Sequence, residues 1–192
     1  MYVSTKTYSP DRGYTVSYRQ HRAESHCNKL HGYALGFHFE FESDELDVRN
    51  WVVDFGSLKT LKDRLDEWFD HTCLVATDDP EFNTFKALHT QGLLKMVEVE
   101  RTGCEGLSKW LFDYVNEIWL PDNGYAPRVR LRRVEVRETG ANSASYEREV
   151  TVAPVPPGDE VVVEAVADGV PKSRLPRWLS RVFPVPPGHD RS

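Results

Sequence analysis

Strict alternation of apolar and polar residues between Gly32 and Glu42 constrains the fold more than any other feature. The apolar members point to one side and the others to the opposite side: Tyr33, Leu35, Phe37, Phe39 and Phe41 against Ala34, Gly36, His38, Glu40 and Glu42. A period of two is typical of an antiparallel strand with one face toward the core and one toward solvent. His31 has the parity of the apolar side, and Cys27 lies just before the strand. The pattern therefore brings an imidazole and a thiol to the rim of a buried surface.

Patterns on both sides of this strand predict further strands and two main helices. In chain order, the expected elements are strands over residues 2–20 with a turn at 9–13, a helix over 58–69, a shorter helix over 80–91, a strand over 93–99, a helix over about 104–120 and a last strand from 129. A one-residue jump in apolar parity within that last strand predicts a bulge near Arg132 and Arg133. Together these elements predict an α+β domain, with an antiparallel four-stranded sheet and the two main helices on one face.

Composition excludes several classes of protein. The chain has 192 residues, 40% of them hydrophobic and 28% charged, which is typical of a soluble globular protein. Its formal net charge of −6 disfavours nucleic acid and anionic membranes as partners, because both bind basic surfaces. No apolar run approaches the roughly 20 residues that span a bilayer, and the N-terminus lacks the apolar core of a secretory signal. Three cysteines without paired spacing predict a reducing, cytoplasmic environment.

A change in composition divides the chain near residue 150. The patterned elements all lie before it, whereas Pro154-Val-Pro-Pro-Gly158 recurs word for word as Pro184-Val-Pro-Pro-Gly188. Pro-rich segments are semi-rigid and do not pack a core. We therefore expect a folded domain over 1–149 and a Pro-rich C-terminal appendage over 150–192, which in one interpretation docks a partner.

Four motifs in the right order resemble the 6-pyruvoyl/6-carboxytetrahydropterin synthase family. They are Cys27-x-x-x-His31-Gly, Val52-Val-Asp-Phe-Gly-x-Leu-Lys59, Asp70-His71 and Arg137-Glu138-Thr139. The resemblance implies the tunnelling fold, in which subunits pool their sheets into an oligomeric barrel, as in a hexamer, with active sites between subunits. It also implies 7,8-dihydroneopterin triphosphate as substrate and a zinc ion held by three histidines.

The resemblance also implies roles for residues of this sequence. Cys27 falls on the family's catalytic cysteine, Asp70 and His71 on its proton-handling pair, and Glu138 on its pterin anchor. Glu105 resembles the glutamate of the family's Pro-Thr-x-Glu element, although the preceding residues differ. A carboxylate suits a pterin because it accepts two parallel N–H donors from the 2-amino-4-oxo edge of the ring.

The zinc ligands depart from the family pattern. His31 matches the first histidine of the family's His-Gly-His, but the second is Tyr33, and the upstream histidine aligns with Tyr18. Zinc favours neutral imidazole or thiolate, and a phenol with a pKa near 10 is a poor ligand. His21 and His26, in the preceding loop, are candidates to complete a metal site with His31. Without a metal, Tyr18 and Tyr33 are expected to hydrogen-bond the substrate side chain.

Each of these roles has a structural alternative. A lone cysteine such as Cys27 is more often a buried small residue than a reactive thiolate. Asp70 and His71 at a helix end also suit a C-terminal cap, because an imidazolium there interacts favourably with the helix dipole. The alternative for Glu138 is a solvated carboxylate at a strand end.

The leading hypothesis from the sequence is a carbon–carbon lyase that makes 6-carboxytetrahydropterin for 7-deazaguanine (queuosine) biosynthesis. Cys27 would take a proton from the substrate side chain, His71 would return one, and a metal near His31 would polarise the side-chain hydroxyls. One rival is 6-pyruvoyltetrahydropterin synthesis, which eliminates triphosphate without breaking a carbon–carbon bond. Another is a non-catalytic pterin- or purine-binding protein that has lost the metal.

Overall fold

A computed structural model describes residues 1–148, which form two four-stranded sheets. The first is antiparallel and contains, in spatial order, β1 (Tyr2–Tyr8), β4 (Gly36–Ser43), β7 (Arg130–Arg137) and β8 (Ser143–Glu147). The second contains β3 (His31–Ala34), β2 (Thr15–Tyr18), β5 (Thr72–Ala76) and β6 (Lys95–Val99). The expected appendage over 150–192 lies outside the described residues.

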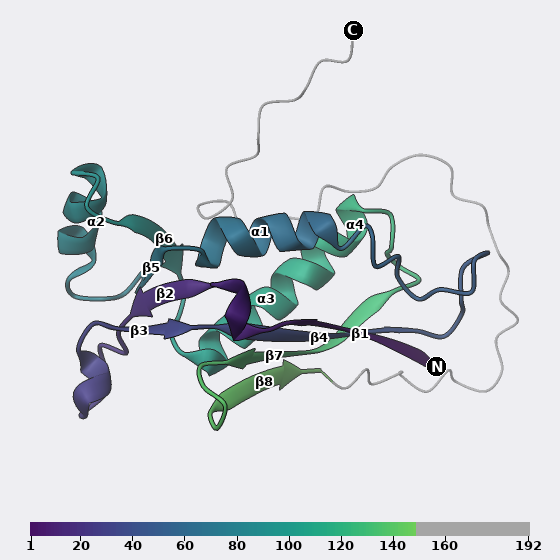
Figure 1. The fold of residues 1–192 in the computed structure, drawn as a ribbon, viewed down its shortest axis with the longest axis horizontal. Helices are drawn as coiled ribbons and strands as arrows, with labels where there is room; N and C mark the ends of the chain where they lie inside the picture. The colour runs from purple at the N-terminus through teal and green to yellow at the C-terminus, as the bar shows by residue number, and fades with distance from the viewer. Residues whose placement is uncertain (149–192) are drawn as a thin grey trace, which may run out of the picture. The chain divides into compact units, whose positions relative to one another are not determined.

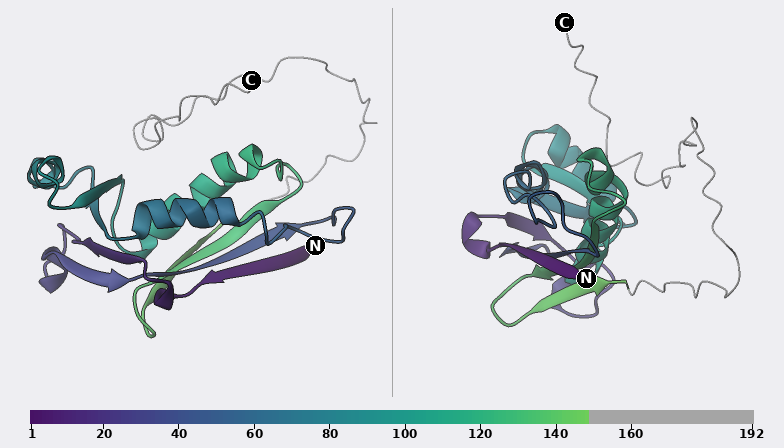
Figure 2. Two further views of the ribbon diagram at one scale, coloured as in Figure 1. Left: turned by 45° about the horizontal axis from the view of Figure 1, so that its top comes forward. Right: turned by 90° about the vertical axis from the view of Figure 1, so that its right-hand side faces the viewer.

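Helices cover one face of the antiparallel sheet, as Figures 1 and 2 show. The two main ones are α1 (Lys59–Phe69) and α3 (Cys104–Tyr114). The other helical segments are η1 (Pro10–Arg12), η2 (His26–Asn28), α2 (Phe82–Thr90), the π-helical turn η3 (Val115–Trp119) and α4 (Leu120–Asp122). The expected α+β class and the placement of the two main helices are confirmed. Among the described residues, we find no helix with the length and apolarity needed to cross a membrane.

The alternating stretch forms the centre of the core, as its pattern predicts. Phe37, Phe39 and Phe41 are at most 1% exposed, and the Phe37 ring lies 4.8 Å from that of Phe69 in α1. The stretch is nevertheless two strands rather than one, because the chain passes from the second sheet (β3) to the first (β4) at Leu35. Pro10 packs against this corner: a Cβ on Gly36 would lie 3.0 Å from Pro10 Cδ, so a larger residue there would force Pro10 to shift.

The predicted bulge in the last strand is confirmed. Glu40 of β4 pairs with Arg133 of β7, and the next residue, Phe41, pairs with Leu131. Arg132 is therefore the extra residue. The bulge lets Leu131 and Val134 both face the core, where each is at most 2% exposed.

The prediction that the strands are all antiparallel is wrong for the second sheet. β5 pairs in parallel with both β2 and β6, and β5 was not predicted as a strand. All five of its residues are buried, so both of its faces are covered and it lacks the polar alternation that marks a half-exposed strand.

Candidate active site

A buried tyrosine and the glutamate that follows β7 meet at the centre of the site. Tyr18 in β2 is 0% exposed, and its hydroxyl donates a hydrogen bond to the carboxylate of Glu138, 120 residues later in the chain. The backbone N–H of Glu138 donates to Asn142 O at 3.1 Å, which holds the β7–β8 turn. Glu138 is therefore half-buried against the core face, on the side that its strand parity indicates. Because Tyr18 is fully enclosed, its hydroxyl is not directly accessible from solvent.

Three rings at the end of the β2–β3 hairpin form a cluster, which we call the ring cluster: Tyr18, His31 and Tyr33. The ring centroids lie 5.6 Å apart for Tyr18 and His31, 5.7 Å for Tyr18 and Tyr33, and 5.2 Å for His31 and Tyr33. Cross-strand pairing explains the arrangement, since Tyr18 pairs with His31, and Tyr33 pairs with the residue two before Tyr18. His31 and Tyr33 are half-buried and form the accessible edge of the cluster.

The tautomer of His31 follows from its partner. Its Nδ1 lies 2.6 Å from the backbone oxygen of Lys29. A carbonyl oxygen only accepts, so Nδ1 carries the proton and donates it. In the neutral ring, Nε2 then holds a free lone pair.

The first turn of α3 adds a thiol whose sequence context predicts only a buried apolar residue. Cys104 is indeed buried, at 6% exposed. Burial, with the nearby carboxylates of Glu138 and Glu105, raises the pKa of this thiol to about 12. The preceding Gly103 has a φ of 89°, and a Cβ there would clash with Gln20 Nε2. Gln20 thus packs over the start of α3, a contact that no local sequence pattern could have revealed.

Cys27 lies near enough to the ring cluster to interact electrostatically with Tyr33. It belongs to η2, it is half-buried, and its backbone oxygen accepts from Gln20 N at 2.9 Å. Burial raises the pKa of Tyr33, and the charges of Glu138 and Cys27 raise it further, so these groups share one electrostatic environment. Within the described residues of a single protomer, no histidine bonds the Cys27 thiol.

Asp70 and His71 form a pair of their own at the end of α1. His71 Nδ1–H donates to Asp70 Oδ1 at 2.5 Å, and the two side chains are 83% and 52% exposed. The next residue, Thr72, pairs with Val16 on the face that carries Tyr18. His71 itself lies just before β5, and its side chain bonds Asp70 and is mostly exposed to solvent. The backbone φ of His71 is 54°. Residues other than glycine adopt this conformation at a cost in free energy, and it is found at functional sites.

The three histidines expected to bind a metal do not come together. His21 lies 3.7 Å from Asp78 and 3.9 Å from Asp79, and His26 is exposed on η2. Across residues 1–148, no group of three His, Cys, Asp or Glu side chains is arranged to hold a metal ion. The prediction of a site from His21, His26 and His31 is therefore not met within one protomer, where His21 lies near the two aspartates that follow β5.

The family's own zinc position does not fit the metal either. Two of its three donors are phenols, and Tyr18 already gives its proton to Glu138. Burial, together with that bond, raises the pKa of Tyr18 well above its usual range, and burial raises that of Tyr33. A zinc ion would have to displace both protons and leave one imidazole as its only ordinary ligand.

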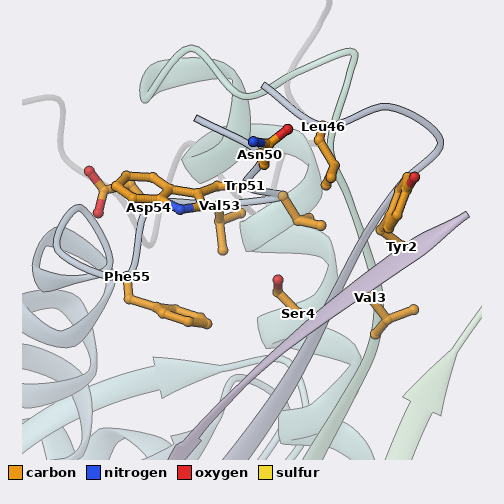
Figure 3. Close-up of a pocket in the computed structure, with 10 residues that line it drawn as sticks. Tyr2, Val3, Ser4, Leu46, Asn50, Trp51, Val53, Asp54 and Phe55 are labelled. Atoms are coloured by element: carbon orange, nitrogen blue, oxygen red, sulfur yellow. The ribbon is translucent and has the colours of Figure 1, made fainter. Parts of the chain in front are cut away.

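A pocket of about 520 Å³ lies elsewhere in the domain. Figure 3 shows it between the start of β1, with Tyr2 and Ser4, and the segment that carries Trp51 and Phe55. Tyr2 pairs with Ser43 at one end of β4, whereas the β7 residue just before Glu138 pairs at the other end. The pocket is therefore remote from the ring cluster, and its lining includes neither Glu138 nor any ring of the cluster.

Comparison with known proteins identifies the family. The model of the family described as 6-pyruvoyl tetrahydropterin synthase matches residues 9–149. The chain belongs to this family. It is 26% identical to the 6-carboxy-5,6,7,8-tetrahydropterin synthase of Aquifex aeolicus over 139 residues, which cover 71% of this chain and 85% of the relative.

Two solved structures show the same fold. An uncharacterized protein from Wolinella succinogenes is 22% identical, with a TM-score of 0.64 over 77% of this chain and 98% of the other. A catalytic-residue mutant of Plasmodium vivax 6-pyruvoyltetrahydropterin synthase is 15% identical, with a TM-score of 0.55 over 77% of this chain and 99% of the other. The assignment of the tunnelling fold from sequence is thereby confirmed for the protomer, and the oligomeric barrel stays a prediction.

Proposed function

We propose that this tetrahydropterin synthase family member converts 7,8-dihydroneopterin triphosphate into 6-carboxytetrahydropterin, a precursor of 7-deazaguanine nucleosides. The relative from Aquifex aeolicus, which carries the name of that activity, supports the choice of reaction. The observation that carries the proposal is the half-buried Glu138 carboxylate, which accepts a hydrogen bond from Tyr18 and, like Cys27, interacts electrostatically with Tyr33.

Glu138 is the proposed ring anchor. A carboxylate offers about four lone-pair sites, and Tyr18 occupies one of them. The remaining sites accept the two parallel N–H groups of the pterin edge in a charge-assisted pair. Glu105, exposed on the first turn of α3 beside Cys104, is the proposed second contact to the ring.

Cys27 and the Asp70–His71 pair are the proposed proton-transfer groups. Cys27, as a thiolate, takes a proton from the substrate side chain, and His71, oriented by Asp70, returns one. Because the His71 side chain is 83% exposed in its own protomer, a neighbouring protomer is the proposed source of this pair. β1 and β8 are the edges of the first sheet and are available to join protomers into a barrel. No step of this scheme passes through a metal.

The proposed setting is a homo-oligomer of hexamer type in the cytoplasm. Cys27, Cys73 and Cys104 are all free thiols, and a reducing compartment keeps them so.

The second candidate is a pterin- or purine-binding protein without catalysis. The two tyrosines at the family's metal positions favour it, because they leave the ring anchor intact and remove the expected Lewis acid. Retention of Cys27, Asp70 and His71 favours the enzyme, since binding a ring needs none of them.

Turnover of 7,8-dihydroneopterin triphosphate, with mass spectrometry of the product, tests the proposal. We expect 6-carboxytetrahydropterin from the wild type, and a loss of at least about 10²-fold in kcat for Cys27→Ala with pterin binding retained. Cys73→Ala is the matched control, because Cys73 is also a free thiol but is buried within β5. A 6-pyruvoyl product would assign the rival reaction, and binding without turnover would assign the binder. Full activity of Cys27→Ala would refute the proton-transfer scheme.

A further inference from the structure

The ring cluster occupies the place where the family resemblance puts a metal, yet its groups are already arranged for another task. Tyr18 donates its hydroxyl hydrogen to Glu138, and His31 donates its Nδ1 hydrogen to Lys29 O at 2.6 Å. A histidine oriented in this way suits a metal or a hydroxyl ligand equally. The neighbouring side chains therefore decide between the two, and they are neutral phenols.

We propose that the ring cluster is a metal-independent site for the hydroxylated side chain of the pterin substrate. In it, His31 and Tyr33 contact the hydroxyl groups, and Tyr18 is a positioning residue that fixes Glu138. This inference rests on the proposed function, because the ring bound by Glu138 is what brings a side chain to the cluster.

Hydrogen-bond polarity defines the ligand class. His31 Nε2 presents a lone pair and no proton, so it pairs with a ligand O–H donor. The Tyr33 hydroxyl both donates and accepts. With the two rings 5.2 Å apart, the site presents an acceptor next to an amphoteric group, which suits two neighbouring hydroxyls on one chain. An anionic group such as phosphate does not suit it. The Glu138 carboxylate is bonded to Tyr18, whose ring lies 5.7 Å from that of Tyr33, and its charge repels a second anion.

Burial separates the role of Tyr18 from that of Tyr33. Tyr18 is 0% exposed, so a ligand cannot contact its hydroxyl directly, whereas Tyr33 is half-buried at the rim. Tyr18 therefore acts on the pterin ring through Glu138, and Tyr33 acts on the side chain. The two tyrosines are predicted to affect different parts of the same ligand.

Binding of two probes to exhaustively chelated protein tests the inference. Neopterin carries a trihydroxypropyl side chain, and 6-methylpterin has the same ring without hydroxyls. We expect the metal-free wild type to bind neopterin more tightly. Loss of one hydrogen bond in Tyr33→Phe should weaken neopterin by about tenfold and leave 6-methylpterin unchanged. Tyr18→Phe should weaken both probes by a similar factor, because it releases the ring anchor.

Tyr8→Phe is the matched control. Tyr8 is also buried and donates its hydroxyl hydrogen to a carbonyl, Leu58 O at 3.2 Å, so its change removes one buried bond outside the cluster. It should alter the affinity of neither probe.

The outcomes separate this inference from the proposed function. If neither probe binds the wild type, the pterin function fails and the inference fails with it. If both probes bind with equal affinity, the inference is refuted and the pterin function stands. The same holds if neopterin binds more tightly than 6-methylpterin only after one zinc per protomer has been restored. Equal losses of both probes in Tyr33→Phe would also refute it.

Discussion

The Tyr18–Glu138 and Asp70–His71 pairs each join a proton donor to a carboxylate, and they differ in almost everything else. Tyr18 in β2 and Glu138, just after β7, are 120 residues apart in the chain, and Tyr18 is fully buried. Asp70 and His71 are adjacent in the chain, and the His71 side chain is 83% exposed. The buried pair can form only when the whole domain has folded, so its geometry is coupled to stability. The exposed pair is set by one helix end, so it is free to act on another protomer.

The largest expected effect concerns the exposed pair. His71→Ala should lower kcat by about 10² to 10⁴-fold, because it removes the proposed general acid. If Cys27 and His71 of one site come from different protomers, co-refolding equal amounts of Cys27→Ala and His71→Ala should restore about a quarter of wild-type activity in a symmetric oligomer. Mixing the proteins without refolding is the control. A co-refolded mixture that stays inactive would place both residues in one protomer and remove this distinction between the two pairs.

The next effect concerns stability and should separate the two pairs. Tyr18→Ala leaves a cavity in the core face and an unpaired Glu138, so it should lower the free energy of unfolding by about 3–5 kcal/mol. Asp70→Ala changes an exposed side chain and should alter it by less than about 0.5 kcal/mol. Urea denaturation followed by tryptophan fluorescence measures both. Comparable losses in the two variants would show that the exposed pair is structural as well.

The smallest effect concerns alkaline pH. Because the pKa of the Cys104 thiol rises from 9.0 to about 12 on folding, its contribution to stability is complete below pH 9 and is lost as the pH rises toward 12. Between pH 9 and 12, unfolding of the wild type therefore releases the thiol proton of Cys104. Cys104→Ala should reduce the number of protons released on unfolding by about one. Asp70→Asn is the control and should leave that number unchanged. Urea unfolding at a series of pH values gives the slope, and an unchanged slope in Cys104→Ala would contradict the burial of this thiol beside Glu138.

Local sequence patterns correctly predicted the strands that have one buried and one exposed face. The alternation around Phe37 and Phe39 and the parity jump at Arg132 both report which side of a strand meets the core. β5 was not predicted because both of its faces are buried. Its sequence therefore lacks the alternation of apolar and polar residues that identifies a half-exposed strand. The motifs around Cys27 and Asp70 were sufficient to identify the family.

The sequence by itself determined the family, the α+β class and the core faces of the strands, because side-chain period and motif order are local properties. Only the tertiary structure decided that Glu138 accepts from Tyr18, that His21 lies near Asp78 and Asp79, and that Cys104 lies beside Glu138. These contacts join segments far apart in the chain, and their geometry depends on how two sheets and a helix pack together.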